Sequence, residues 1–548
     1  MHKPLLALAA ALLATAANAD TLVYNANGIQ IDRFGHLASF YGFVVGDDGK
    51  VTRLVRADEP RPQSTNAIDM QGRMLLPGLI DAHAHVTDLG FFALRLDLTG
   101  TKSVGELQQR LRDYAAAHPD TKWIQGGGWN QELWSEKRFP TAADLDAAVP
   151  DRPVVLDRVD GHAIVANSVA MKAAGVTPAT PAPHGGEIHD GLFVDNAMDL
   201  VSKAIPAPSD AEMDQALAKS QDILLGYGIT AVGSMSTSVA SWSAFRRAGQ
   251  AGRLNVRMMT YISGTESMRA VPHPTEWEFG DRLRAVGVKL FADGALGSRG
   301  AWLKQSYADQ PDSRGLQFHS DAEMLSLADT AASAGFQVAT HAIGDAANAQ
   351  IIGVYEQLSK KYGANRRWRI EHFQIADPVD IPRLAPAGII ASMQPTHQTS
   401  DRLMAEKRLG PNRLAGAYAW QSVLKSGARL AFGSDVPVES PNPFPGLSAA
   451  VSRQDVSGQP PGGWIPSERL SVAQALDAFT RGAAYAGFAE DKIGSLGPGK
   501  WADFIVIDRD PTKVDAQNLA KTQVLETWVA GKKVWERAPS ASATERGR

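Results

Sequence analysis

Short apolar segments alternate with longer amphipathic ones through the middle of the chain, from residue 75 to about residue 488. Segments 154–156, 286–291 and 430–432 have the length and residue types of buried strands, whereas 322–334 repeats apolar residues at helical spacing. Such an alternation predicts an α/β fold with a parallel sheet. We expect the sheet to close into a (β/α)8 barrel of TIM type. A doubly wound open sheet is the alternative. Such a sheet would favour a Gly-x-Gly-x-x-Gly motif after an early strand, and the sequence has none there.

Both ends of the chain have a different sequence pattern, which predicts short strands separated by turns. Residues 22–24, 29–31 and 38–45 are extended runs punctuated by turn signals at Gly28, Gly35 and 47–49, and 502–507 continues the pattern near the C-terminus. We therefore expect residues 20–74 and 489–537 to build one small β domain beside the barrel.

Two further segments stand apart from the barrel pattern. Residues 102–206 are too many for one connection between a strand and a helix, so we expect an insertion that covers the barrel mouth. The last residues, 538–548, are polar and predict a disordered tail.

The first 19 residues have the composition of a cleaved signal peptide. Lys3 precedes an almost wholly apolar run at 5–16, and Ala17-Asn18-Ala19 supplies the small residues of a signal-peptidase site. The run is shorter than the roughly 20 residues that cross a bilayer, although an uncleaved membrane anchor is the alternative. We expect a periplasmic or secreted protein with no membrane contact after cleavage.

Composition excludes several classes of site. The chain has 548 residues, no cysteine and a formal net charge of −4. Without cysteine there can be no disulfide, thiolate zinc site or cysteine nucleophile. The near-neutral charge gives no reason to expect nucleic-acid binding, so a small-molecule substrate is the expected partner. The oligomeric state stays open, with a homodimer as one option.

The strongest local signal is a pair of histidines, His83 and His85, after the apolar segment 76–80. On a strand these residues point to the same face and can bind one metal ion together. Two structural histidines would explain the pair alone. Three more candidate ligands end other predicted strands, where barrel enzymes place their active sites: His341, His372 and Asp435. Imidazole and carboxylate suit a zinc-like cation.

Two other residues are candidates for substrate contact. His397 follows the predicted seventh strand and could face the substrate. Trp129 could form a pocket wall, with burial in a core as the alternative.

The sequence resembles the amidohydrolase superfamily, and within it amidohydrolase family 3, the branch of N-substituted formamide deformylase-like proteins. The motifs that carry the resemblance occur in the family's order over nearly all the mature chain, at residues 77–85, 123–129, 160–162, 288–295, 340–345, 371–372, 433–437 and 497–503. The resemblance implies a (β/α)8 barrel beside a small β-sandwich formed from both chain ends.

The resemblance also implies a role for Lys289 at the end of the fourth strand. Related enzymes carry there a lysine carboxylated by CO2, whose carbamate bridges two cations. An unmodified lysine beside Asp293, with a single metal, is the alternative. The two-metal form has six ligands: His83, His85 and Asp435 on one ion, His341 and His372 on the other, and Lys289 on both.

The activity so implied is that of a metal-dependent amidohydrolase, which cleaves an amide or N-acyl C–N bond by a metal-activated hydroxide. Asp435 would shuttle the proton to the leaving amine. Asp160 and His162 match the family pattern, and we expect them to bind the substrate, with a structural histidine as the alternative. Hydrolysis of an ester or lactone, deamination of a ring, and a non-catalytic metal- or ligand-binding barrel remain alternatives. Zinc is the expected metal, as one or two ions.

Overall fold

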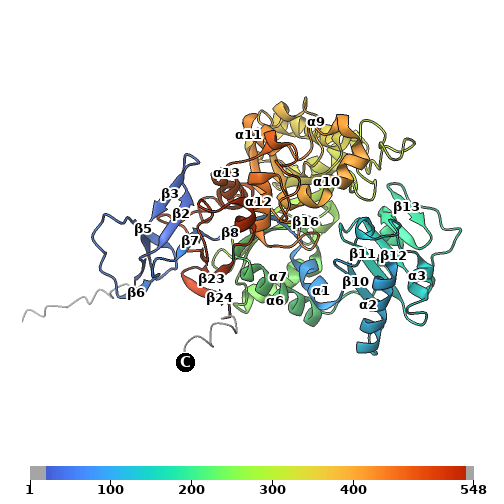
Figure 1. Cartoon of the computed structure of the whole chain (residues 1–548), viewed down its shortest axis with the longest axis horizontal. Helices are drawn as coiled ribbons and strands as arrows, with labels where there is room; N and C mark the ends of the chain where they lie inside the picture. The colour runs from blue at the N-terminus through green and yellow to red at the C-terminus, as the bar shows by residue number, and fades with distance from the viewer. Residues whose placement is uncertain (1–19, 539–548) are drawn as a thin grey trace, which may run out of the picture.

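The centre of the molecule is an eight-stranded parallel sheet that closes on itself (Figure 1). The computed structural model describes residues 20–538, so the predicted signal peptide and nearly all of the predicted tail lie outside the described residues. The last and first strands meet through a parallel bridge between Ala84 and Val436. The (β/α)8 barrel is therefore confirmed. Its strands are β8 (Leu79–Ala84), β15 (Ile229–Thr237), β16 (Arg257–Ser263), β17 (Leu283–Phe291), β18 (Gln337–Ala342), β19 (Arg369–His372), β20 (Ile390–Met393) and β21 (Arg429–Phe432).

Helices cover the outside of this barrel. Several begin at a capping box; in one, the Ser320 hydroxyl accepts from the backbone N–H of Glu323, whose carboxylate accepts from the backbone of Ser320. Their apolar faces pack on the strands. The helices of this layer are α1 (Val86–Leu94), α6 (Asp210–Gly226), α7 (Val239–Gln250), α8 (Asp321–Ser333), α9 (Asp345–Tyr362), α10 (Pro395–Leu409), α11 (Trp420–Lys425), α12 (Pro443–Ser452), α13 (Val472–Asp477) and α14 (Ala483–Ala486).

Apolar side chains fill the barrel interior below its mouth. Ile80 of β8, Met259 and Tyr261 of β16 and Ile390 of β20 belong to one buried cluster. Inward-facing positions alternate along each strand. Polar side chains therefore collect at the carboxyl ends of the strands, above this apolar plug.

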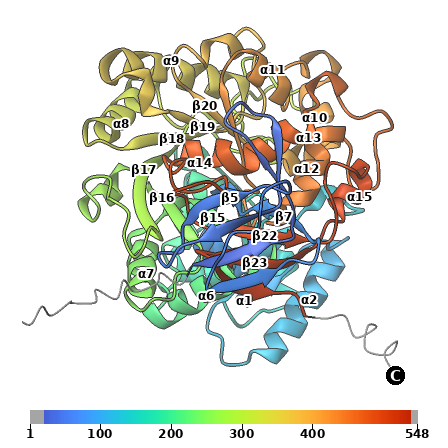
Figure 2. The same ribbon diagram turned by 90° about the vertical axis from the view of Figure 1, so that its left-hand side faces the viewer.

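Two smaller sheets lie beside the barrel, and the larger of them combines strands from both ends of the chain (Figure 2). β7 of the N-terminal part pairs antiparallel with β22 of the C-terminal part. The sheets share a core in which the rings of Phe43 and Phe504 lie 5.2 Å apart, as in a sandwich. One sheet contains β1 (Thr21–Tyr24), β4 (Gly42–Val45), β5 (Val51–Val55) and β6 (Asn66–Asp69); the other contains β2 (Asn27–Ile31), β3 (Leu37–Phe40), β7 (Met74–Pro77), β22 (Phe504–Ile507), β23 (Val524–Val529) and β24 (Lys532–Glu536). The short helix α15 (Ala516–Ala520) connects β22 to β23.

The region predicted as an insertion forms a separate sheet with its own core, at the right of Figure 1. Its strand β11 contains the segment 154–156, which therefore belongs to this sheet and not to the barrel. The sheet consists of β9 (Leu96–Asp97), β10 (Ile124–Trp129), β11 (Val154–Arg158), β12 (Ala163–Ala166), β13 (Gly186–His189) and β14 (Leu192–Asp195), with helices α2 (Val104–Ala117), α3 (Ala142–Asp146), α4 (Ser168–Ala173) and α5 (Asp199–Ser202).

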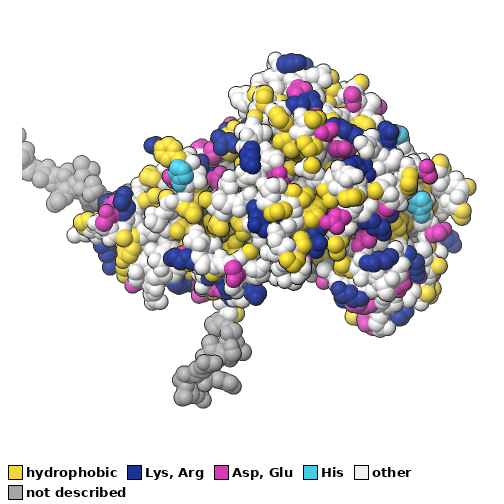
Figure 3. Space-filling view, turned by 45° about the horizontal axis from the view of Figure 1, so that its top comes forward, with side chains coloured by type: hydrophobic (Ala, Val, Ile, Leu, Met, Phe, Trp, Pro, Cys, Tyr) yellow, Lys and Arg dark blue, Asp and Glu magenta, His cyan; other side chains and the backbone are white. Residues whose placement is uncertain are grey.

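The described surface carries mixed charge. On the face shown in Figure 3, Lys and Arg side chains are interspersed with Asp and Glu side chains. Within residues 20–538, no helix combines the length and apolar character needed to cross a bilayer.

Candidate metal centre

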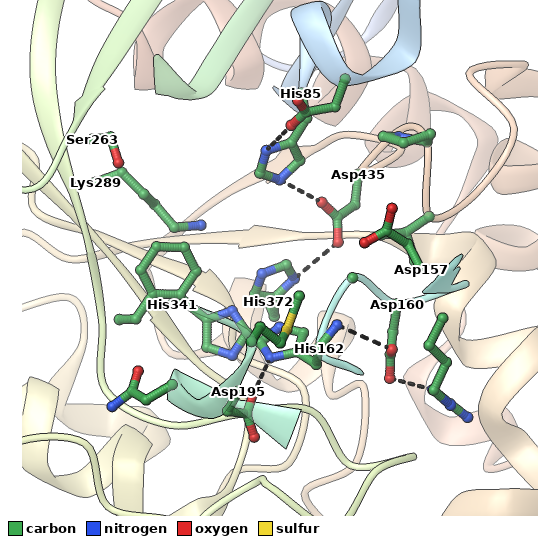
Figure 4. A pocket seen from close by; sticks show the side chains of 18 of the residues that line it. His85, Asp157, Asp160, His162, Asp195, Ser263, Lys289, His341, His372 and Asp435 are labelled. Atoms are coloured by element: carbon green, nitrogen blue, oxygen red, sulfur yellow. Dashed lines mark hydrogen bonds and ion pairs between the residues drawn. The ribbon is translucent and has the colours of Figure 1, made fainter. Parts of the chain in front are cut away.

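Three potential metal ligands converge at the mouth of the barrel. His83 lies near the end of β8, His85 directly follows β8 and Asp435 follows β21, so barrel closure brings the three residues together. The Nε2 atoms of His83 and His85 each lie 3.2 Å from Oδ1 of Asp435. Figure 4 shows His85 and Asp435 at one side of the pocket. Two imidazoles and one carboxylate at this spacing can hold one divalent cation and leave a coordination position open.

The hydrogen bonding of His83 fits a metal ligand. Its Nδ1 lies 2.7 Å from Oε2 of the buried Glu371, which accepts a hydrogen bond from the Nδ1–H group and so leaves a lone pair on Nε2. That Nε2 atom is buried and lies 3.2 Å from Oδ1 of Asp435 without forming a well-aligned hydrogen bond. A buried imidazole lone pair beside a carboxylate oxygen is costly unless a cation lies between the two acceptors.

Three further residues of the predicted set surround the same space. The rings of His341 and His372 lie 4.6 Å apart, and that of His372 lies 4.8 Å from that of His83. Nδ1 of His372 lies 2.9 Å from Oε1 of Gln394 and 3.8 Å from Oδ2 of Asp435. Lys289 is buried nearby, and this burial lowers the pKa of its amine to about 8. A larger fraction of Lys289 is therefore in the neutral amine form, which reacts with CO2, than in a solvated lysine.

Backbone strain accompanies these residues. His372 has φ of 75°, Phe373 of 43° and Asp435 of 61°, in the left-handed region that non-glycine residues seldom adopt. Such conformations persist where the surrounding structure enforces them, and they concentrate at functional sites.

Buried carboxylates hold the strand ends that carry the ligands. Asp81 accepts hydrogen bonds from the backbone N–H of His83 and from the backbone and hydroxyl of Ser434. Asp293 accepts from three backbone N–H groups around the start of α9. Burial raises the pKa of Asp81 to about 6 and that of Asp293 to about 7.

Sequence reasoning missed the supporting roles of Asp81, Glu371 and Arg369. The signal available was an acidic or basic residue inside an otherwise apolar strand, which a barrel interior tolerates only with partners.

The insertion forms the opposite wall of a pocket with a volume of about 740 Å³, lined by His85, Lys289, His341, His372 and Asp435 on the barrel side. His162 reaches into this pocket, and its ring lies 5.0 Å from that of His341 (Figure 4). Its Nδ1 lies 2.6 Å from Oδ1 of Asp195. Burial opposes a charge on His162, but the hydrogen bond and charge of Asp195 outweigh it and raise the pKa of this imidazole.

Asp160 also lines the pocket. One of its carboxylate oxygens pairs with Arg158, and the other accepts from the backbone N–H of His162 over 3.2 Å. Asp160 therefore fixes the loop that carries His162.

Two predicted substrate residues lie elsewhere than expected. Trp129 is fully buried in the core of the insertion, where its Nε1 donates to the carbonyl of Leu156, so it forms no pocket wall. His397 is buried behind the centre, with Nε2 3.8 Å from Oδ2 of Asp435. It forms a second group of potential ligands with His372 and Asp435, and so lies beside the ligands instead of on the substrate-facing wall.

Residues 66–535 match the Amidohydrolase family, and the chain belongs to this family. It is 33% identical to YtcJ of Bacillus subtilis (strain 168), over 86% of this chain and 91% of that protein. It is 26% identical to N-substituted formamide deformylase of Arthrobacter pascens, over 95% and 99% of the two chains. The structure is also similar to that of an uncharacterized metal-dependent hydrolase from Pyrococcus horikoshii OT3, with a TM-score of 0.75 and 27% sequence identity. The two structures align over 91% of this chain and 99% of the other chain. The protein is therefore a hydrolase.

Proposed function

We propose that this protein is a metal-dependent hydrolase that cleaves an amide or N-acyl C–N bond of a small molecule. The observation that carries the proposal is the convergence of His83, His85 and Asp435 at a pocket that His85 and Asp435 line, where the buried Nε2 of His83 lies 3.2 Å from Oδ1 of Asp435 without a well-aligned hydrogen bond. The similarity to a protein named N-substituted formamide deformylase supports the choice of a C–N bond, since a formamide is cleaved between carbon and nitrogen.

The residues have distinct roles in this reaction. A divalent cation at the centre would lower the pKa of water towards neutrality and polarise a carbonyl oxygen. Asp435 touches both imidazoles at the mouth of the barrel, and its carboxylate accepts the proton of the attacking water and returns it to the leaving nitrogen. His162, on the opposite wall, binds and orients the substrate carbonyl or carboxylate.

We further propose zinc as the metal and a carbamate on Lys289. The donor set of imidazole and carboxylate suits zinc, and the lowered pKa of the buried Lys289 favours the amine form that CO2 attacks. A carbamate there would add an anionic oxygen donor beside His341 and His372. The N-terminal segment supports a periplasmic or secreted location.

Removal of metal is expected to abolish hydrolysis. The protein would be treated with a strong chelator, dialysed, and assayed on a panel of N-formyl and N-acetyl amines, with metal content measured by mass spectrometry. Activity should return with zinc at a stoichiometry of one or two ions per chain, because the imidazoles and carboxylate remain in place. A chelated, metal-free protein with full activity would contradict the proposal.

The same assay separates the alternatives when esters and lactones are included. Faster turnover of an ester or lactone than of every amide would reassign the bond type but leave the metal centre intact. Tight zinc binding without turnover of any amide, ester or lactone would instead favour a binding protein.

Replacement of His162 by alanine is expected to raise KM by about tenfold, because a charge-assisted hydrogen bond to the substrate is lost. Metal content should stay unchanged, since His162 is not among the ligands of the centre. Its matched control is His189→Ala, because His189 is an exposed histidine of the same insertion. Equal KM values for the His162→Ala variant and the parent protein would show that His162 does not bind the substrate.

A further inference from the structure

Most charged side chains of the pocket have partners within the protein. Asp160 pairs with Arg158, Asp195 with His162, and Asp435 with the histidines of the centre. Asp88 lies 3.8 Å from Nδ1 of His85. Asp160, Asp195 and Asp435 are therefore held within the protein and are not free to select a ligand.

Two carboxylates that line the pocket, Asp157 and Glu266, have no such partner among the described residues. Asp157 is the penultimate residue of β11, in the wall that the insertion contributes, and its side chain is exposed to the pocket. Within residues 20–538, no group donates a hydrogen bond to its carboxylate. Figure 4 shows it among the labelled side chains between Asp435 and Asp160, without a dashed line to either. The directly adjacent position on β10 is Gly127, which has no side chain to reach it.

The surroundings of Asp157 leave its charge poorly compensated. Enclosure by the pocket walls raises the pKa of Asp157 to about 7, while Arg95 opposes this rise and Asp88 adds to it. The guanidinium of Arg95 is held against the ring of Phe91, 4.3 Å from its centroid, and does not form an ion pair with Asp157. An ammonium group of a ligand would supply the positive charge and the hydrogen-bond donors that the protein does not provide to the carboxylate of Asp157.

Apolar side chains line the same pocket, together with the charged side chains of Arg95 and Asp88. Phe91 and Phe92 of α1 line the pocket, and Met198 and Phe318 extend the same kind of lining. A ligand that extends from the metal centre towards Asp157 can therefore place hydrocarbon against these apolar side chains. An alkyl or aryl spacer fits this path better than a polar chain.

We propose that Asp157 is a specificity-determining residue that binds a protonated amine of the substrate. The preferred substrates are then amides or N-acyl compounds with an ammonium group at the end of an apolar spacer. This inference rests on the proposed hydrolysis at the metal centre and names the substrate class for it.

The kinetic test compares two substrates that differ only in the amine. N-acetyl-1,4-diaminobutane carries the ammonium group, and N-pentylacetamide replaces it with a methyl group. The parent protein should prefer the first, and Asp157→Asn should lower kcat/KM for it by about tenfold while N-pentylacetamide is unaffected. The matched control is Asp120→Asn, because Asp120 is an exposed carboxylate of the same insertion outside the pocket. Equal losses on both substrates, or no loss, would overturn the proposal.

A binding measurement makes the inference independent of turnover. Calorimetry with 1,4-diaminobutane should give a Kd about tenfold higher for Asp157→Asn than for the parent protein. If amine binding depends on Asp157 but no amide is hydrolysed, the proposed function fails and the amine site stands. If amides are hydrolysed without preference for an ammonium group and the diamine binds both proteins equally, the amine site fails and the proposed function stands.

Discussion

Replacement of Asp435 by asparagine is expected to lower kcat by about a thousandfold, within the range that a positioned acid–base group contributes. The side chain of asparagine has nearly the same shape but cannot accept the proton of the attacking water. Asp435 has φ of 61°, a conformation that asparagine adopts as readily as aspartate. The substitution therefore removes the charge without straining the backbone.

Metal content decides how the loss of turnover is interpreted. If Asp435→Asn keeps its metal, as we expect from the remaining His83 and His85 and the amide oxygen, the lost rate belongs to proton transfer. If the metal is lost as well, Asp435 acts mainly as a ligand. The matched control is Asp312→Asn, because Asp312 is exposed on the surface and away from the pocket. Near-normal kcat in Asp435→Asn would refute the role of proton shuttle.

The barrel could be predicted from sequence because its strands are local patterns. Apolar segments such as 286–291 and 430–432 are short and continuous, as strands buried on both faces require. The rule that strand ends meet at one rim then brings His83, His85 and Asp435 together without knowledge of the packing. In the structure their ring and carboxylate atoms lie within reach of one ion.

The orientation of Trp129 could not be predicted, because it depends on an irregularity of the strand. The register between β10 and β11 shifts between Gly127 and Trp129, and Gly128 has φ of 92°. A bulge of this kind inserts a residue and turns the following side chains to the other face. Trp129 consequently points into the core of the insertion.

The supporting network around the ligands could not be predicted either, because it joins residues distant in the chain. Glu371 and His83 are 288 positions apart, and their hydrogen bond depends on the stagger of strands on opposite sides of the barrel. The same holds for Asp157, whose exposure to the pocket depends on how the insertion lies over the barrel mouth. Spacing along one strand carries no information about either contact.

Substitution of Glu371 is expected to have the largest effect on stability. Arg369 and Glu371 are fully buried inside the barrel and joined by two hydrogen bonds, of 2.7 Å at Nε and 3.0 Å at Nη2. Although burial favours the neutral acid, Arg369 keeps the pKa of Glu371 well below its ordinary value, so the pair is ionic. Glu371→Leu leaves the charge of Arg369 unpaired in the core and should lower the free energy of unfolding by about 3 kcal/mol. Urea denaturation monitored by circular dichroism measures this change.

The same substitution is expected to weaken metal binding by about 10- to 100-fold, because His83 loses the acceptor that fixes its tautomer. Glu371→Gln is the matched control: its amide oxygen can still accept from Nδ1 of His83, but it has no charge for Arg369. We expect Glu371→Gln to lose stability and keep most of its metal affinity, whereas Glu371→Leu loses both. Competition with a zinc chelator measures the affinity. Equal metal affinity in the two variants would show that the hydrogen bond from His83 does not orient the ligand, and that Glu371 serves the barrel only as the partner of Arg369.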